Sequence, residues 1–267
     1  MDIFFKKIKY ALKAFREYPD FEIERKISAI NFLVRNENLK TYYQPIMDLG
    51  TGNILGYEAL NRPELGAAFN NASELFSFAE KQGLIYDLDL KCRELSVIRI
   101  ANSLNNQLLF LNVNSNVLLE VSKENDPFAK IINKLRIDKS NLVLEITERE
   151  AIKDFNLFNK VLDQYREEGF KVAVDDLGAG YSSLQTIAEL KPDFIKLDMS
   201  LVHDIHKIDY KLLLVETLVE FAKKSKSLLI AEGIEQSEEF EVLTQLGVPF
   251  GQGYYIEKPK YYIELAS

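Results

Sequence analysis

The chain has 267 residues, of which 47% are hydrophobic and 28% are charged, a composition typical of a globular protein with a large buried core. A formal net charge of −8 argues against a surface that binds DNA or RNA, and no apolar stretch reaches the roughly 18 residues that span a bilayer. The chain contains no secretory-signal pattern, and its single cysteine excludes an internal disulfide. We therefore expect a cytoplasmic protein.

The first forty residues are charged and helix-prone, and no strand-like run precedes Thr41. We expect residues 1–40 to form a helical lead-in and residues 41–267 to form one barrel domain. The amphipathic stretch 4–15 is expected to pack on that domain or on a partner helix rather than on a membrane surface.

Beyond the lead-in, short runs rich in Val, Ile, Leu and Phe alternate with helical patterns. Near-continuous hydrophobicity of such runs is typical of parallel strands that are covered on both faces. Helices are predicted at 71–83, 152–165 and 209–226, the first with a capping-box pattern at Asn71 and Glu74. The predicted strands, in chain order, are 41–49, 53–60, 107–113, 141–147, 170–176, 193–198, 227–232 and 248–256.

Eight strands in a chain of this length favour a (β/α)₈ barrel over a doubly wound sheet, and a barrel carries its active site at the carboxyl ends of its strands. Five of the apolar runs end in acidic residues or in a lysine beside one. Carboxylates that crowd together resist ionising unless cations lie among them, so the pattern predicts a divalent metal site. These residues are Glu58, Glu145, Glu148, Asp175, Asp176, Lys196, Asp198, Glu232 and Glu235.

Several motifs follow one another between about Thr41 and Pro259. They are YYQPI at 42–46, Glu58-Ala59-Leu60-Asn61-Arg62, Asn112, Glu145-Ile146-Thr147-Glu148, Asp175-Asp176, Lys196-Leu197-Asp198, Ala231-Glu232-Gly233-Ile234-Glu235 and Gln252-Gly253-Tyr254. In this order they resemble the EAL family, the phosphodiesterases of the bacterial second messenger cyclic di-GMP. The resemblance implies a TIM-like (β/α)₈ barrel of the EAL type. It also implies metal-dependent hydrolysis of cyclic di-GMP to linear 5′-pGpG, with two Mg²⁺ or Mn²⁺ ions.

The resemblance also assigns a role to each motif residue. Metal ligands are expected at Glu58, Asn112, Glu145, Asp175, Asp176 and Glu235, with Asp175 shared between the two ions. The expected catalytic residues are Glu232 as general base, Lys196 as a point charge, and the ligands Glu58 and Asp175. The expected substrate contacts are Arg62, Gln252, Asp198 and Leu60, and Glu148 is expected to anchor the loop after Asp176.

Adjacent strand residues normally point to opposite faces, so Asp175 and Asp176 share a site only if the chain turns there. Gly178 and Gly180 are expected to supply that turn. Two histidines, His203 and His206, lie outside every acidic motif and are expected to face solvent.

Leu177 and Ala179 stand where the family has an aromatic residue and a hydroxyl, and this departure leaves a second function open: a catalytically weak or inactive EAL domain that acts as a cyclic di-GMP receptor. An enolase-like lyase would leave Asn112 and Gln252 unexplained, and a purely structural protein would have no use for so many converging acids. The resemblance further implies a homodimer, and an unidentified regulatory partner could act through the N-terminal helix.

Overall fold

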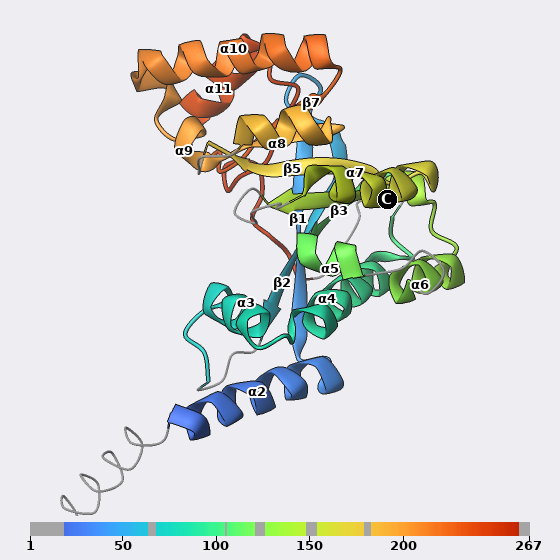
Figure 1. The fold of residues 1–267 in the computed structure, drawn as a ribbon. Helices are drawn as coiled ribbons and strands as arrows, with labels where there is room; N and C mark the ends of the chain where they lie inside the picture. The colour runs from blue at the N-terminus through green and yellow to red at the C-terminus, as the bar shows by residue number, and fades with distance from the viewer. Residues whose placement is uncertain are drawn as a thin grey trace, which may run out of the picture. The chain divides into compact units, whose positions relative to one another are not determined.

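The computed structural model describes residues 19–63, 68–104, 106–120, 126–147, 154–178 and 183–261. Within these residues, eight strands close into a barrel in chain order (Figure 1). Strands β2 to β8 pair in parallel, and β1 pairs with β8 in the antiparallel direction. The strands are β1 (Leu39–Asp48), β2 (Ile54–Pro63), β3 (Leu108–Val113), β4 (Leu142–Thr147), β5 (Lys171–Leu177), β6 (Phe194–Leu197), β7 (Leu228–Ala231) and β8 (Phe250–Gly251).

The antiparallel direction of β1 differs from the parallel strands that the hydrophobicity predicted. Only residues 49–53 join β1 to β2, and a parallel pair needs a crossover of a dozen or more residues. The turn is held by the Asp48 carboxylate, whose Oδ1 accepts hydrogen bonds from the backbone N–H groups of Gly50 (2.9 Å) and Thr51 (2.8 Å). The short connection therefore determines the direction of β1.

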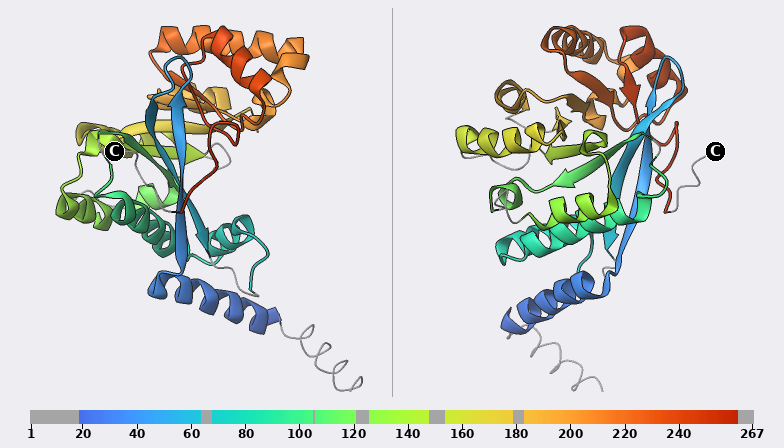
Figure 2. Two further views of the ribbon diagram at one scale, coloured as in Figure 1. Left: turned by 180° about the vertical axis from the view of Figure 1, so that it is seen from behind. Right: turned by 90° about the vertical axis from the view of Figure 1, so that its right-hand side faces the viewer.

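Helices follow most of the strands, as the alternating pattern predicted. Figure 2 shows α7, α8 and α10 on the outer side of the barrel, where α7 and α8 pack against β5 and α10 packs against β7. The helices are α2 (Pro19–Asn36), α3 (Ala72–Lys81), α4 (Ile85–Ile100), α5 (Ser115–Glu120), α6 (Pro127–Leu135), α7 (Phe155–Glu167), α8 (Ser183–Leu190), α9 (Met199–Val202), α10 (Asp209–Ser225) and α11 (Ser237–Leu246), with 3-10 turns η2 (Lys139–Asn141) and η3 (Ile205–Lys207).

The helices predicted at 71–83 and 209–226 are confirmed as α3 and α10. The helix predicted at 152–165 is confirmed as α7 from Phe155 onward, whereas Ile152 lies outside the described residues. The Asn71 side chain caps α3 by accepting from the Glu74 backbone N–H (2.8 Å). The Glu74 carboxylate binds Asn70 instead of Asn71, so the predicted capping box is formed one residue earlier. In the described part of the chain, no helix combines the length and the apolar character that crossing a membrane requires.

The chain divides into two compact units, one made of residues 1–40 and 62–91, the other of residues 41–61 and 92–267. In the first unit, α2 provides the helix predicted for the lead-in, whereas the stretch 4–15 lies outside the described residues. Lys26 of α2 contacts α3, because its Nζ lies 2.7 Å from Glu74 Oε1. The predicted domain division at residue 40 remains a prediction.

The second unit contains a layer of inward-pointing apolar side chains at the centre of the barrel. Because strand side chains alternate, a residue two positions further along the same strand also points inward, toward the carboxyl ends of the strands. The inward face of a strand therefore holds a core residue first and, two positions later, a residue of the polar site. The core residues are Ile46, Phe110, Val143, Ala173, Phe194 and Ile230, and the residues two positions after the last five are Asn112, Glu145, Asp175, Lys196 and Glu232.

Candidate metal and active site

Lys196 of β6 lies at the centre of the polar site, with a side chain that is fully buried. Its Nζ lies 2.7 Å from Glu232 Oε1, 2.8 Å from Glu145 Oε1, 3.2 Å from Asp175 Oδ1 and 3.3 Å from Glu58 Oε2. We refer to these four acids as the carboxylate cluster. When all are ionised, one ammonium faces four carboxylates, so the cluster keeps an excess of negative charge.

Two amide side chains hold the carboxylate cluster from neighbouring strands. Asn112 of β3 donates from Nδ2 to Glu58 Oε1 at 3.3 Å. Gln252, directly after β8, donates from Nε2 to Glu58 Oε2 at 2.5 Å and to Glu232 Oε1 at 3.1 Å. Each oxygen of Glu58 therefore has an amide donor, which fixes the orientation of this carboxylate.

Burial and the neighbouring charged and polar groups together shift the pKa values of the cluster in different directions. Burial raises the pKa of Glu145 and of Glu232 well above the usual glutamate value, although the Lys196 charge opposes the rise. Burial alone would lower the pKa of Lys196, but the surrounding carboxylates raise it well above its usual value. For Glu58, the Lys196 charge and the two amide hydrogen bonds outweigh burial and lower the pKa. Lys196 therefore stays charged, and its single positive charge is shared among four carboxylates.

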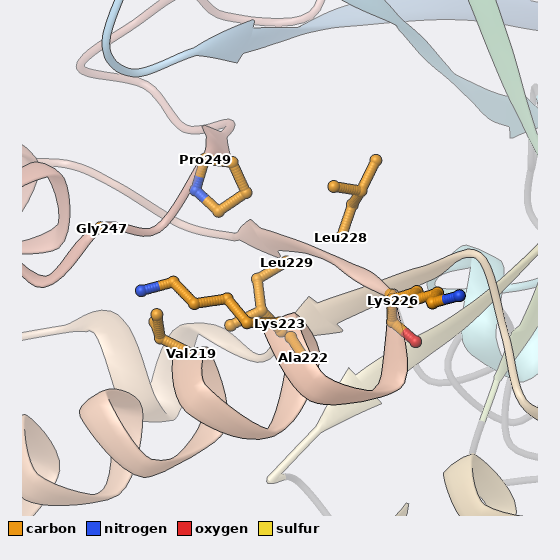
Figure 3. A pocket seen from close by; sticks show the side chains of 9 residues that line it. Val219, Ala222, Lys223, Lys226, Leu228, Leu229, Gly247 and Pro249 are labelled. Atoms are coloured by element: carbon orange, nitrogen blue, oxygen red, sulfur yellow. The ribbon is translucent and has the colours of Figure 1, made fainter.

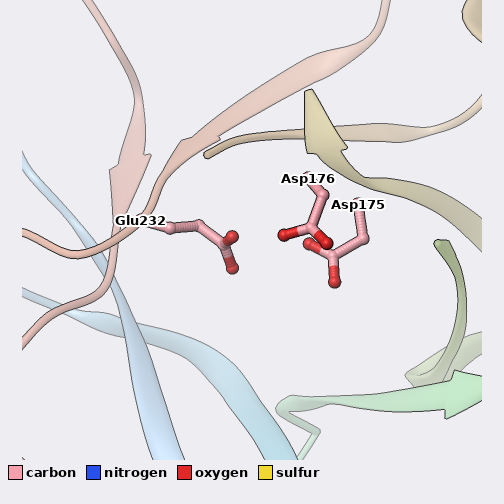
Figure 4. A group of neighbouring side chains, drawn as sticks. All are labelled: Asp175, Asp176 and Glu232. Carbon is pink, nitrogen blue, oxygen red and sulfur yellow. The ribbon is translucent and has the colours of Figure 1, made fainter. Parts of the chain in front are cut away.

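Asp176 reaches the same space as Asp175 because the backbone turns at Asp176 itself. Its φ of 59° lies in the left-handed region, and the pairing of β5 with β6 has an irregular register between Val174 and Leu177. Figure 4 shows the carboxylates of Asp175 and Asp176 facing that of Glu232, and one oxygen from each lies within 4.8 Å of the others.

The turn at Asp176 corrects the expectation that the glycines after it bring the two aspartates together. Gly178 has a φ of 112°, but it follows the turn, and Gly180 lies outside the described residues, as does Ala179. An aspartate in the left-handed region is one of the non-glycine residues that tolerate it, and such strain is typical of functional sites.

The donor set fits a hard divalent cation. Among the described residues, neither oxygen of Glu145 accepts a hydrogen bond beyond its ion pair with Lys196, and Asp175 Oδ1 is in the same position. Buried oxygens of this kind normally have a partner. Carboxylate and amide oxygens are the ligands that Mg²⁺, Mn²⁺ and Ca²⁺ prefer, so a cation would supply the missing partner.

The remaining predicted residues lie in varied surroundings. Asp198 follows β6 and caps α9, since its Oδ1 accepts from the backbone N–H two residues on at 2.9 Å. Glu235 and Arg62 have exposed side chains, and Leu60 is half-buried. Glu148 lies outside the described residues.

A separate cavity of about 290 Å³ lies beside the amino end of β7 (Figure 3). The carboxylate cluster lies at the other ends of the strands, as Glu232 follows the carboxyl end of β7. The cavity is therefore not part of the predicted site. Its lining residues are Val219, Ala222, Lys223, Lys226, Ser227, Leu228, Leu229, Gly247 and Pro249.

Gly253 packs directly against the loop that carries Glu232. A Cβ at this position would lie 2.1 Å from the backbone oxygen of Ile234 and 2.3 Å from its nitrogen. We expect Gly253→Ala to lower the free energy of unfolding by about 1–3 kcal/mol, because backbone atoms must shift to admit the methyl group. Chemical denaturation measures this loss. Gly50→Ala is the control, since its Cβ would meet the nearest atom at 3.5 Å, and an equal loss in both variants would contradict the argument.

Comparison with known proteins identifies the family. A family model described as the EAL domain matches residues 27–259. The chain is 32% identical over 229 residues to the probable cyclic di-GMP phosphodiesterase PdeB of Escherichia coli, covering 84% of this chain and 43% of PdeB. It is 34% identical over 229 residues to the cyclic di-GMP phosphodiesterase PA2567 of Pseudomonas aeruginosa, covering 84% of this chain and 38% of that protein. The chain thus spans less than half the length of these relatives.

Solved structures share the fold. A calcium/cy-diGMP complex of BlrP1 from Klebsiella pneumoniae matches with a TM-score of 0.77 and 28% identity, over 85% of this chain and 57% of BlrP1. A standalone EAL protein from Vibrio cholerae in its c-di-GMP bound form matches with a TM-score of 0.73 and 28% identity, over 83% of this chain and 92% of that one. With the match of the family model across most of its length, this chain belongs to the EAL domain family.

Proposed function

We propose that this chain hydrolyses cyclic di-GMP to linear 5′-pGpG with the help of two Mg²⁺ or Mn²⁺ ions. The observation that carries the proposal is the carboxylate cluster, in which four acids converge on the single ammonium of Lys196 within the described residues. Added cations would neutralise such an excess of buried negative charge without protonating the acids. The relatives named as cyclic di-GMP phosphodiesterases support the substrate.

The chain's acids and one amide would hold the ions. Glu58, Asn112, Glu145 and Asp175 are the proposed ligands of the first ion. Asp175 and Asp176 are the proposed ligands of the second, and Glu235 is proposed to bind its waters. When bound by these residues, two such ions would lower the pKa of a bound water and would stabilise negative charge that develops at phosphorus.

In hydrolysis, a bond forms between the water oxygen and phosphorus, and the bond between phosphorus and the ribose 3′ oxygen breaks. Glu232 is the proposed acceptor of the water proton, because burial raises the pKa of this carboxyl well above the usual glutamate value and so makes it a stronger base. Lys196 stays positively charged and would stabilise the negative charge that develops in the transition state. The 3′ oxygen takes a proton from solvent as it leaves.

Other motif residues are proposed to position the substrate. Arg62 suits a phosphate oxygen through its planar guanidinium. Gln252, Asp198 and Leu60 are the further proposed substrate contacts. Glu148 is proposed to anchor the loop after the aspartate pair.

We also propose that the protein is a cytoplasmic homodimer, with residues 1–40 as a lead-in to the barrel domain at 41–267. A regulatory partner would act through the N-terminal helix. Size-exclusion chromatography with light scattering tests the dimer directly.

The function is tested by incubating purified protein with cyclic di-GMP and Mg²⁺ or Mn²⁺ and separating the products by chromatography. We expect 5′-pGpG as the product, and we expect EDTA to abolish its formation. Tight binding of cyclic di-GMP without any product would instead indicate a receptor. If the protein neither binds cyclic di-GMP nor forms product from it, the proposal is refuted.

A further inference from the structure

Glu239, in the first turn of α11, is a fully buried carboxylate that belongs to none of the motifs. Its Oε2 accepts hydrogen bonds from the backbone N–H groups of Glu235 (2.9 Å) and Gln236 (3.1 Å). Its Oε1 accepts from the backbone N–H of Asp204 (2.9 Å) and lies 3.4 Å from Nδ1 of His203. One carboxylate therefore joins two separate loops of the barrel.

Both loops leave the carboxyl ends of strands that carry site residues. The first follows β6, which holds Lys196, and it reaches Glu239 at Asp204. The second follows β7 and runs from Glu232 to Glu235. Inside the site, the ion pair between Glu232 Oε1 and Lys196 Nζ (2.7 Å) joins the ends of the same two strands, β6 and β7. Glu239 thus connects, outside the site, the two segments that meet inside it.

The contacts exceed what capping a helix requires. In a capping box, the N3 carboxylate accepts one hydrogen bond, from the backbone N–H of the N-cap residue, which is Gln236 here. The hydrogen bonds from the backbone N–H groups of Glu235 and Asp204 are not part of this capping box. Asp204 also has a φ of 55°, in the left-handed region, so its backbone conformation needs support from its surroundings.

A charged acceptor is suited to this task. Hydrogen bonds to a carboxylate are stronger than those to a neutral oxygen, and only a carboxylate offers acceptors in both directions without a donor. A buried carboxylate is costly unless it is well bonded, and here three backbone donors compensate that cost.

We propose that Glu239 is a positioning residue, which fixes the loop after β7 against the loop after β6 and so holds Glu232 at Lys196. The effect on hydrolysis rests on the proposed function, whereas the effect on the loops does not. Glu239 does not touch the substrate, and it acts through the backbone of Glu235 and Asp204.

Glu239→Gln tests the proposal with little change in volume. The amide can accept from one loop, but its NH₂ group then faces the donors of the other loop. We expect amide hydrogen exchange to become about tenfold faster or more in residues 203–204 or 233–236, as measured by NMR or mass spectrometry. We expect kcat to fall about 10–100-fold with KM within about twofold of wild type, the range typical of residues that orient catalytic groups.

Asn71→Ala is the matched control, because it removes a helix cap from α3 without touching either loop. It should lower Tm by a comparable amount and leave kcat and exchange at residues 203–204 and 233–236 unchanged. Unchanged exchange in Glu239→Gln, or a loss of kcat no larger than in the control, would overturn the proposal. If the wild-type protein forms no 5′-pGpG, the proposed function fails, and the exchange comparison alone decides the role of Glu239.

Discussion

Replacing Glu58 with glutamine is expected to lower kcat for cyclic di-GMP hydrolysis about 10³-fold. The loss has two sources. The change removes one negative charge from a proposed metal ligand. Stabilisation of transition-state charge by a bound metal ion is worth several kcal/mol. Each loss of about 1.4 kcal/mol lowers the rate about tenfold. In addition, Asn112 donates to Oε1 and Gln252 to Oε2, so the NH₂ of the new amide must face a donor whichever way it is oriented.

Two measurements separate these sources. Steady-state kinetics at saturating Mn²⁺ gives kcat, and calorimetric titration with Mn²⁺ gives the affinity for the ion, which is expected to weaken. Glu216→Gln, an exposed glutamate on α10, is the matched control and should retain wild-type values. A Glu58→Gln variant that kept kcat within about tenfold of wild type would show that Glu58 is not a ligand in the reacting complex.

The fold could be predicted from the sequence because it depends on local pattern. Apolar runs that alternate with helical periods left few architectures, and the closed barrel is one of them. The direction of β1 was predicted wrongly because hydrophobicity was weighed above loop length, although the five residues at 49–53 exclude a crossover.

The gathering of the acids could also be predicted, since strand ends meet at one face of a barrel. The central place of Lys196 could not, because a sequence gives no distances between strands. The left-handed turn at Asp176 was missed for a related reason: a non-glycine residue with positive φ has no reliable sequence signal. For Glu239, the one available signal was its spacing of three from Gln236, and that pattern predicts a helix cap and nothing about a second loop.

Replacing Lys196 with methionine, which keeps the length of the side chain but removes its charge, is expected to destabilise the metal-free protein strongly. Removing one partner of a buried ion pair typically costs about 3–5 kcal/mol, since the remaining charge is left uncompensated. Here several carboxylates lose the ammonium that the described residues supply to them. Urea unfolding in EDTA measures the loss, and Lys130→Met, at an exposed position of α6, is the control.

The loss is expected to depend on pH in a definite direction. Burial already raises the pKa of Glu145 and Glu232 above the usual value of 4.5, and without the lysine charge the rise becomes larger. A carboxyl whose pKa is raised by folding supports the fold fully below its unfolded pKa and loses that contribution as pH rises through the folded pKa. Lys196→Met should therefore be closer to wild type in stability near pH 5 than near pH 8.

Added cations distinguish this electrostatic account from simple loss of packing. Mn²⁺ supplies positive charge to the same carboxylate oxygens, so it should recover more stability in Lys196→Met than it adds to the wild-type protein at pH near 8. A loss that is the same at both pH values and unaffected by Mn²⁺ would mean that Lys196 contributes by filling space. The ammonium and the metal ions neutralise the same carboxylate oxygens. Lys196→Met, which lacks the ammonium, should therefore gain more stability from Mn²⁺ than the wild-type protein does.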